Sequence, residues 1–286
     1  MGDPEREVVG VFRSELGKLG YIEGKNLVFD LREANGRLER IPALMDELIA
    51  LRPDIIVAVS NPVVAAAQHA TATIPIVMWS VVDPVHFGFV SSLAHPGGNT
   101  TGTTAVSDVY MSKAVELLHL LVPAAHRIAM LHASGPATPL YLGQVKKVAE
   151  PMGLTIVPIS APTPADLERA FVEIVAKECE ALFVPLTAAH NGPAIPLLAA
   201  RSKLPAVYQL LNLVEDGGLA SYSEDHKQIA RRSAYLVDRI FKGTRPSDLP
   251  IEEPVTFILA VNLKAAAALG LTIPDAILAR ADRVIE

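Results

Sequence analysis

The feature that most constrains the fold of this chain is a repeated alternation of short apolar runs with longer segments of helical spacing. Apolar residues at positions 8, 12, 16 and 19 recur with helical spacing, and the apolar run at 55–59 is short enough for one strand buried on both faces. Strands that alternate with helices of this length predict parallel sheets joined by right-handed crossovers. The sequence therefore predicts an α/β fold.

The alternation predicts strands and helices at definite positions. The predicted strands cover residues 27–31, 55–59, 74–79, 127–131, 154–157, 181–184 and 205–208. The predicted helices begin near Asp3 and Pro4, run through 38–49, start again at Pro62, and then lie near 111–121, 140–152, 165–177, 193–202 and 226–241.

Two glycine-rich segments interrupt this alternation. The segment HPGGNTTG at 95–102 cannot continue a helix or a strand through Pro-Gly-Gly-Asn, and we interpret it as a crossover between two similar lobes. The segment DGGLASY at 216–222 precedes a long helix, and we interpret it as the second crossover. We therefore expect one lobe from residues 1–103 and 226–250, a second from 104–225 and 251–286, and a ligand cleft between them.

Composition and charge exclude several functions. The 286 residues carry a net charge of −6, whereas nucleic-acid binding needs clustered Lys and Arg, so we expect no nucleic-acid partner. Cys179 is the one cysteine, which rules out an internal disulfide and a multi-cysteine metal site. No apolar run is long enough to span a membrane, and the first residues have the character of a helix start and not of a signal peptide.

The sequence carries none of the searched motifs for catalysis or cofactor binding. It has no G-x-G-x-x-G after a strand, no G-x-S-x-G and no H-E-x-x-H, and its eight histidines are scattered. We therefore predict that the chain is not an enzyme and has no catalytic residue, metal ligand or cofactor. An enzyme on two α/β lobes remains an alternative that detected turnover would favour.

Polar side chains gather just after the predicted strands. Ligands of open parallel sheets bind at the carboxyl ends of the strands, so these side chains form the predicted site. The predicted ligand-binding residues are Arg32, Ser60, Asn61, Ser80 and Asp83 in the first lobe, and Thr187, Tyr208, Gln209, Ser221 and Tyr222 in the second. His132 and Ser134 hold the matching positions after the strand at 127–131.

Hydroxyl and amide groups of this kind suit an uncharged or zwitterionic solute. The helix starts after Ser60 and Ser80 favour a carboxylate, and Asp83 suits an ammonium group. Five of these residues also have a structural explanation. Ser60 and Asn61 are ordinary helix caps, Asp83 before Pro84 is typical of a turn, and Tyr208 and Tyr222 are typical of packing residues as well as of cleft walls.

An ordered set of short segments resembles one family over nearly the whole chain. The segments are LGYIEGKNL at 19–27, IPIV at 74–77 with DPV at 83–85, PGGNTTG at 96–102, GGLASY at 217–222, FKG at 241–243 with Pro246, NLK at 262–264, ALGLTIP at 268–274 and LARAD at 278–282. The set resembles ABC transporter substrate-binding proteins whose best-known members bind tryptophan, tyrosine or phenylalanine.

The resemblance implies two Rossmann-like lobes of type I periplasmic-binding architecture. It implies capture of a small polar solute, an amino acid and possibly an aromatic one, by hinged closure, followed by delivery to an ABC permease. It also implies a periplasmic or membrane-associated extracytoplasmic location. The alternative function is a ligand-sensing module of a regulatory or signalling protein with the same fold.

Two positions depart from the family pattern. The family usually has a signal peptide and a central first strand before the first helix, and both are missing here, so we expect the first lobe to be rearranged, completed by another chain or less stable. The family often has a tryptophan after the arginine that matches Arg32, where this chain has Glu33. Trp79 ends a predicted strand, and we expect it to face the cleft.

Overall fold

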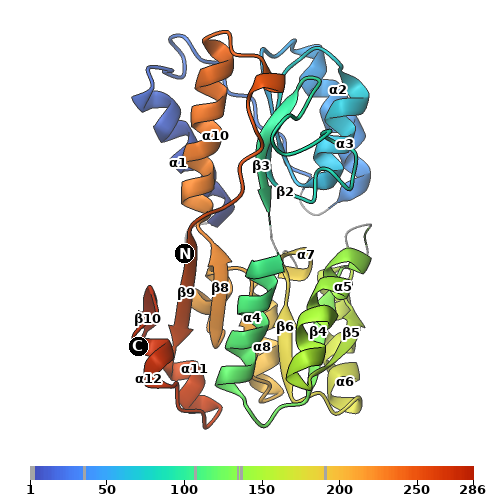
Figure 1. Cartoon of the computed structure of the whole chain (residues 1–286), viewed down its shortest axis with the longest axis vertical. Coiled ribbons are helices and arrows are strands. Elements are labelled where there is room, and N and C mark those ends of the chain that lie inside the picture. The colour runs from blue at the N-terminus through green and yellow to red at the C-terminus, as the bar shows by residue number, and fades with distance from the viewer. Residues whose placement is uncertain (1–3, 35–36, 106–107, 134, 136–137, 190–191) are drawn as a thin grey trace. The chain divides into compact units, whose positions relative to one another are not determined.

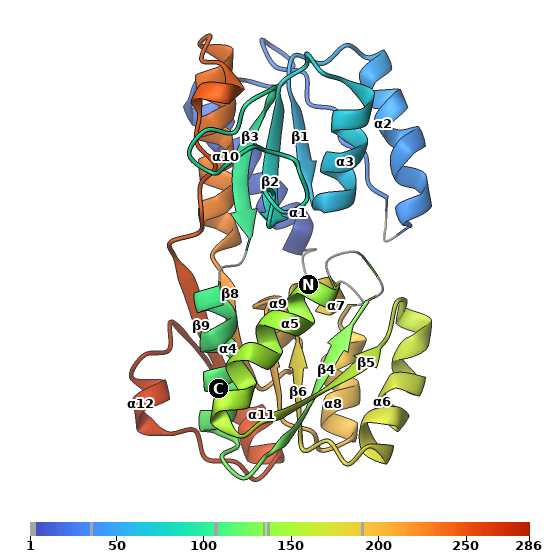
Figure 2. The ribbon, with the colours of Figure 1, turned by 45° about the vertical axis from the view of Figure 1, so that its right-hand side comes forward.

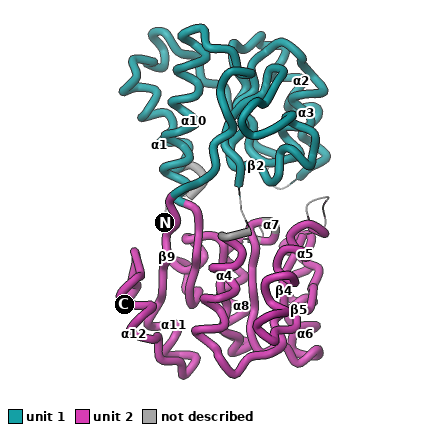
Figure 3. The backbone as a smooth tube through the Cα atoms, in the orientation of Figure 1, with its two compact units in different colours: residues 1–106, 225–255 teal, residues 107–224, 256–286 magenta. Residues whose placement is uncertain are grey.

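The computed structural model of the chain divides into two compact units (Figure 3). Unit 1 comprises residues 1–106 and 225–255, and unit 2 comprises residues 107–224 and 256–286. The structure describes all residues except 1–3, 35–36, 106–107, 134, 136–137 and 190–191. The chain passes between the units three times, after residues 106, 224 and 255.

Unit 1 contains a parallel sheet in the strand order β1-β2-β3 (Figure 1). The strands are β1 (Ile56–Val59), β2 (Ile76–Val82) and β3 (Thr100–Ala105). The helices are α1 (Pro4–Lys18), α2 (Ile41–Ala50), α3 (Asn61–Ala70) and α10 (His226–Phe241), with single 3-10 turns at Leu38–Arg40 and Pro246–Asp248.

Helices cover both faces of this sheet, as Figure 2 shows for unit 1. Val77 and Trp79 of β2 pack in one apolar cluster with residues of α1 and α10. Ile76 and Met78 pack in a second cluster with residues of α2 and α3. Successive side chains of a strand point to opposite faces, so β2 joins two separate apolar layers.

Unit 2 contains a larger sheet in the strand order β10-β9-β8-β7-β6-β4-β5. Its strands are β4 (Arg127–His132), β5 (Thr155–Ser160), β6 (Ala181–Val184), β7 (Ala206–Tyr208), β8 (Ala220–Glu224), β9 (Phe257–Asn262) and β10 (Arg283–Ile285). Neighbouring strands are parallel except for β8 and β9, which are antiparallel.

The helices of unit 2 pack on both faces of its sheet. They are α4 (Asp108–Leu121), α5 (Thr138–Ala149), α6 (Leu167–Ala176), α7 (Leu186–Ala189), α8 (Ala194–Arg201), α9 (Asn212–Glu215), α11 (Leu263–Ala268) and α12 (Asp275–Leu278), with 3-10 turns at Glu150–Met152 and Pro164–Asp166. Residues of α6 and α8 share one apolar cluster with β4 to β7. The α/β fold class predicted from the sequence is confirmed.

Most of the predicted elements are present within one to four residues of their predicted bounds. The helix predicted at 226–241 has those bounds in α10, where the Asp225 side chain caps the helix by accepting hydrogen bonds from the backbone N–H groups of Lys227 and Gln228. The strand predicted at 181–184 is β6, and all four of its residues are buried. Strands β3, β8, β9 and β10 were not predicted.

The strand predicted at 27–31 is wrong. Within the described residues its one β-type pairing is an isolated bridge between Glu23 and Leu27, and Val28 is 84% exposed. A strand needs a neighbour for its N–H and C=O groups, and among the described strands β1 pairs only with β2. The segment therefore has the sequence of a strand without a ladder partner.

The two Gly-rich segments lie close to the crossings between the units but do not form them. The loop at 95–99 stays in unit 1 and leads directly into β3 beside β2. The Gly217–Gly218 turn stays in unit 2 and leads into β8 beside β7, and the chain leaves unit 2 only after Glu224. In each case the Gly-rich turn comes one strand earlier than the crossing.

Candidate functional site

Three predicted site residues of unit 1 lie at one edge of its sheet. Ser60 follows β1, Ser80 lies near the end of β2, and Asp83 follows β2. Because β1 and β2 are parallel neighbours, their carboxyl ends lie at the same edge. The structure therefore brings these three residues to neighbouring strand ends of unit 1.

The backbone is strained at these three positions. Their φ angles are +78° at Ser60, +51° at Ser80 and +40° at Asp83, a region that non-glycine residues enter at a cost. Among the described residues, the other positive-φ residues apart from glycine directly follow helix C-caps, where this conformation is common; they are Arg52, Glu178 and Lys203. Among these non-glycine residues, positive φ away from helix C-termini thus coincides with the predicted site.

The Asn61 side chain joins the two strand ends. Its Nδ2 donates to the carbonyl of Val82 at 2.8 Å, and its Oδ1 accepts from the Val82 N–H at 3.0 Å. Asn61 is 8% exposed, so both amide atoms are used inside unit 1. The structure gives this residue a bracing role, and its predicted contact with ligand stays a prediction.

Ser60 and Asp83 differ in how their side chains are used. Ser60 is exposed, and although it precedes α3 its hydroxyl does not cap that helix. Asp83 is half-buried, and its Oδ1 accepts a hydrogen bond from the His86 N–H at 3.1 Å, which is the turn geometry that its sequence context also predicted. Capping of α3 therefore does not occupy the Ser60 hydroxyl.

Arg32 is not tied to these strand ends in the structure. Its Nε donates to Glu47 Oε2 of α2 at 3.0 Å, and its Nη1 donates to the Leu31 carbonyl. The side chain is 30% exposed. Its assignment as a ligand contact stays a prediction.

Trp79 lies inside the core of unit 1, which corrects the expectation that it faces a cleft. It is 6% exposed, and its ring centroid lies 5.3 Å from that of Phe12 in α1. Trp79 lies on the same face of β2 as Val77, as regular strand alternation gives, and residues of α1 and α10 cover that face.

In unit 2, Tyr208 and Gln209 lie deeper than the sequence predicted. Tyr208 is 1% exposed and packs in the apolar cluster, which favours the packing explanation over a cleft wall. Gln209 is also 1% exposed; its Oε1 accepts from the Leu186 N–H of α7 at 2.8 Å, and its Nε2 lies 3.1 Å from Met111 Sδ. Gln209 thus holds the chain after β6 against α4.

The remaining predicted residues of unit 2 have different environments. Ser221 is fully buried in β8, and its Oγ has no hydrogen-bond partner among the described residues. His132 is half-buried, and its Nδ1 lies 3.2 Å from the Ala133 carbonyl. Thr187 belongs to α7 but its side chain lies outside the described part of the structure, as does all of Ser134.

Tyr222 belongs to a group of three aromatic rings that the sequence did not predict. Its ring lies 5.4 Å from Phe257 of β9 at an interplanar angle of 12°, and 5.8 Å from Tyr110 of α4. Tyr222 and Phe257 are half-buried, whereas Tyr110 is 2% exposed. Because the strand at 257 was not predicted, no sequence signal placed these rings together.

Burial raises the pKa of four tyrosines of unit 2, the fully buried Tyr110, Tyr141 and Tyr208 and the half-buried Tyr222. In the unfolded chain these phenols ionise at about pH 10, so above that pH the unfolded state binds fewer protons than the folded state. The stability that burial of the neutral phenols provides is therefore present below about pH 10 and is lost as the pH rises further.

We expect alkaline unfolding of unit 2 to be accompanied by cooperative ionisation of these buried phenols. A spectrophotometric titration of phenolate absorbance, compared with circular dichroism over the same pH range, measures this. Tyr208→Phe should reduce the alkaline loss of stability by up to about 1.4 kcal/mol per pH unit. Ionisation of all tyrosines while the circular dichroism stays native would contradict the expectation.

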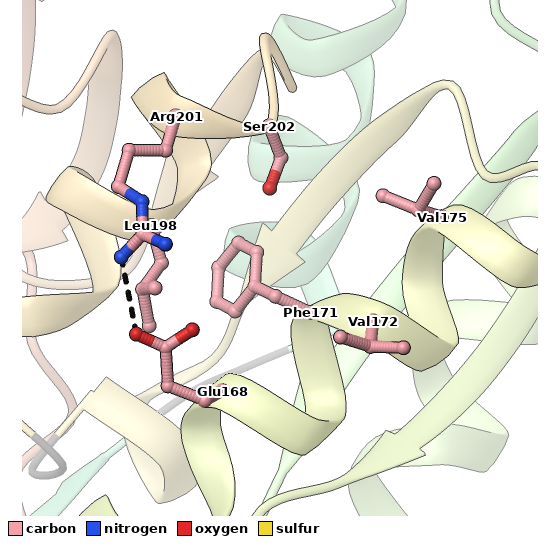
Figure 4. Close-up of a pocket in the computed structure, with 7 residues that line it drawn as sticks. All are labelled: Glu168, Phe171, Val172, Val175, Leu198, Arg201 and Ser202. Atoms are coloured by element: carbon pink, nitrogen blue, oxygen red, sulfur yellow. Dashed lines mark hydrogen bonds and ion pairs between the residues drawn. The ribbon is translucent and has the colours of Figure 1, made fainter.

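Two surface hollows lie away from the predicted residues. One lies between α6 and α8 of unit 2, where Phe171, Val172, Val175 and Leu198 form an apolar surface (Figure 4). The ion pair of Glu168 with Arg201, at 3.1 Å, borders it. A second hollow lies between α2 and α3 of unit 1. None of the predicted ligand-binding residues lines either hollow.

Within the described residues, no group of three or more His, Cys, Asp or Glu side chains is arranged to hold a metal ion. In the same residues, no helix has the length and apolarity that crossing a membrane requires.

Comparison with solved structures defines the class of protein. The chain has the type I periplasmic-binding-protein fold. A conserved domain protein from Vibrio cholerae O1 biovar El Tor is 31% identical with a TM-score of 0.90, covering 97% of this chain and 95% of that one. An ABC domain from Streptococcus pneumonia, solved in complex with L-Trp, is 26% identical with a TM-score of 0.90, covering 97% and 94%.

Comparison of the sequence shows the family. Residues 2–285 match the family described as ABC transporter substrate binding protein, and the chain belongs to that family. A relative named tyrosine-binding protein, from Clostridioides difficile strain R20291, is 26% identical over 243 residues, which are 84% of this chain and 70% of the relative. The resemblance noted from the sequence segments is confirmed.

Proposed function

We propose that this chain captures an amino acid, with an aromatic one as the first candidate, and delivers it to an ABC permease. The observation that carries the proposal is the set of strained polar strand ends in unit 1, formed by Ser60, Ser80 and Asp83. Strained backbone is retained where surrounding structure enforces it, and it concentrates at ligand sites. Family membership supports a small-molecule ligand and a transporter partner.

The proposed ligand is a zwitterion that lies at the carboxyl ends of the strands. The N-terminus of α3, which follows Ser60, would attract its carboxylate, and the Asp83 carboxylate would attract its ammonium group. In unit 2, the half-buried rings of Tyr222 and Phe257 would supply an apolar wall. Two relatives, one solved with L-Trp bound and one named for tyrosine binding, support an aromatic amino acid.

Binding would stabilise a closed arrangement of the two units around the ligand, with the cleft between them as the binding place. A ligand that contacts both units shifts the population toward the closed state by its differential affinity. No catalytic step is part of the proposal. The proposed location is extracytoplasmic, at the outer face of the membrane that holds the permease.

Asp83→Asn tests the proposed ammonium contact. The amide keeps an acceptor for the His86 N–H and tolerates the positive φ, but it removes the negative charge. Loss of a charge-assisted hydrogen bond predicts affinity for L-tryptophan or L-tyrosine about 10-fold to 100-fold weaker. The measurement is the ligand-induced rise in melting temperature, titrated over amino-acid concentration.

The matched control is Asp54→Asn. Asp54 is exposed and precedes β1, at the opposite end of the strand from Ser60. The control should keep the affinity of the parent protein. Equal affinities for the parent and both variants would refute the role of Asp83, and a parent protein that binds no amino acid would refute the proposed function.

A further inference from the structure

The end of β2 contains a bulge whose backbone is held by side chains of other segments. β2 and β3 pair Met78 with Gly102 and next pair Val81 with Thr104, so two residues of β2 stand opposite Thr103. The bulge includes Ser80, and the Ser80 N–H donates to Thr103 Oγ1 at 3.0 Å. A side-chain hydroxyl thus accepts this hydrogen bond where the ladder is interrupted.

The next two residues of β2 are held in the same way. The Thr104 hydroxyl donates to the Val81 carbonyl at 2.7 Å. The Asn61 amide makes its two hydrogen bonds to the N–H and carbonyl of Val82. Thr103 and Thr104 are 3% and 5% exposed, so these bonds are shielded from water and their loss has a cost.

The braced residues adjoin the strained ones. Ser80 and Asp83 hold positive φ angles on either side of Val81 and Val82. A non-glycine residue in a sparsely populated backbone region costs about 1–3 kcal/mol and persists only where surrounding contacts enforce it. The hydrogen bonds at residues 80, 81 and 82 are contacts of that kind. Without them the strand end would relax and carry the Ser80 and Asp83 side chains to new positions.

We infer that Thr103 is a positioning residue of the ligand site: its hydroxyl fixes the Ser80 N–H and thereby the strained strand end that presents Ser80 and Asp83. Thr104 and Asn61 complete the brace on the residues that follow. The part of this inference that concerns ligand affinity rests on the proposed function. The part that concerns the backbone of residues 79–83 does not.

Thr103→Val removes the hydroxyl and keeps the shape of the side chain. We expect affinity for L-tryptophan or L-tyrosine to fall by about tenfold, because the Ser80 N–H loses its acceptor. We also expect faster hydrogen exchange of the amides of residues 79–83 without any ligand. Thr103→Ser keeps the hydroxyl and should restore both properties to within about threefold of the parent.

Thr101→Val is the matched control. Thr101 lies in the same strand, is fully buried, and donates its hydroxyl to the Leu249 carbonyl at 2.8 Å, away from the bulge. This variant loses a comparable hydrogen bond and should lower the melting temperature by a similar amount. It should leave ligand affinity and the exchange of residues 79–83 unchanged.

The two readouts separate failure of this inference from failure of the proposed function. Equal effects of Thr103→Val and Thr101→Val on exchange at residues 79–83 would overturn the inference, whether or not a ligand binds. If the parent protein binds neither amino acid, the proposed capture of an aromatic amino acid is refuted. Faster exchange in Thr103→Val alone would then still support the brace.

Discussion

Gly102→Ala is expected to destabilise unit 1 by about 3–5 kcal/mol, because this position has neither the space nor the backbone conformation for a side chain. A Cβ at residue 102 would lie 2.7 Å from the Cα of Met78 and closer still to its backbone N and O. The φ angle of +140° is itself unfavourable for any residue except glycine. Relief would require β3 to move away from β2.

The change is measured by urea unfolding followed through tryptophan fluorescence. Trp79 is the only tryptophan of the chain and lies in β2, so its emission reports on unit 1. Gly98→Ala is the control, since a Cβ there meets no atom within 4 Å and only the φ of +61° is strained; about 1 kcal/mol is expected. Similar losses for the two variants would show that the packing of β3 on β2 is not as tight as described.

Phe12→Ala is expected to cost about 3–5 kcal/mol, the range of large-to-small changes in a core. Phe12 is 2% exposed, and its ring packs against Trp79 at 5.3 Å and Phe29 at 6.1 Å between ring centroids. Its removal leaves a cavity beneath α1 and uncovers one face of the tryptophan. The emission maximum of Trp79 should therefore shift to the red even in the folded variant.

Leu19→Ala serves as the comparison for this substitution. Leu19 follows the end of α1 and is 40% exposed, so its truncation should change stability by no more than about 0.5 kcal/mol and leave the emission maximum unchanged. A stable Phe12→Ala variant with unchanged emission would contradict the assignment of Trp79 to the core beneath α1.

Local sequence patterns were sufficient to predict those elements whose signals lie within the element itself. The helix at 226–241 has an N-capping Asp225 and a regular apolar stripe, and the strand at 181–184 is apolar at every position. Both signals lie within a few residues of the element itself. Their bounds could be predicted because no distant contact changes them.

The errors arose where distant contacts decide the structure. Residues 27–31 have strand composition, but within the described residues they have no ladder partner. β3 was missed because its Thr-Gly-Thr sequence is not apolar, and its burial depends on the close approach of Gly102 to Met78. The crossovers were displaced as a result, since a strand follows each Gly-rich turn before the chain leaves its unit.

The candidate site shows the same difference between features that local patterns predict and features that distant contacts decide. Reading strand ends from the sequence brought Ser60, Ser80 and Asp83 to one edge of the sheet, although β2 continues to Val82 and Ser80 lies within it. Periodicity could not show that Tyr208 would be enclosed by the core or that Asn61 would bond to Val82. The hydrogen bond from Ser80 to Thr103 exists only because of a bulge, which no local pattern predicted.

Isothermal titration calorimetry of L-tryptophan and L-tyrosine into the protein, after unfolding and refolding to remove any bound ligand, measures the proposed binding itself. We expect one ligand per chain for at least one of the two amino acids, with a Kd of about 10 μM or tighter. The absence of binding heat for both, together with no change in melting temperature for any other amino acid, would contradict the proposed function.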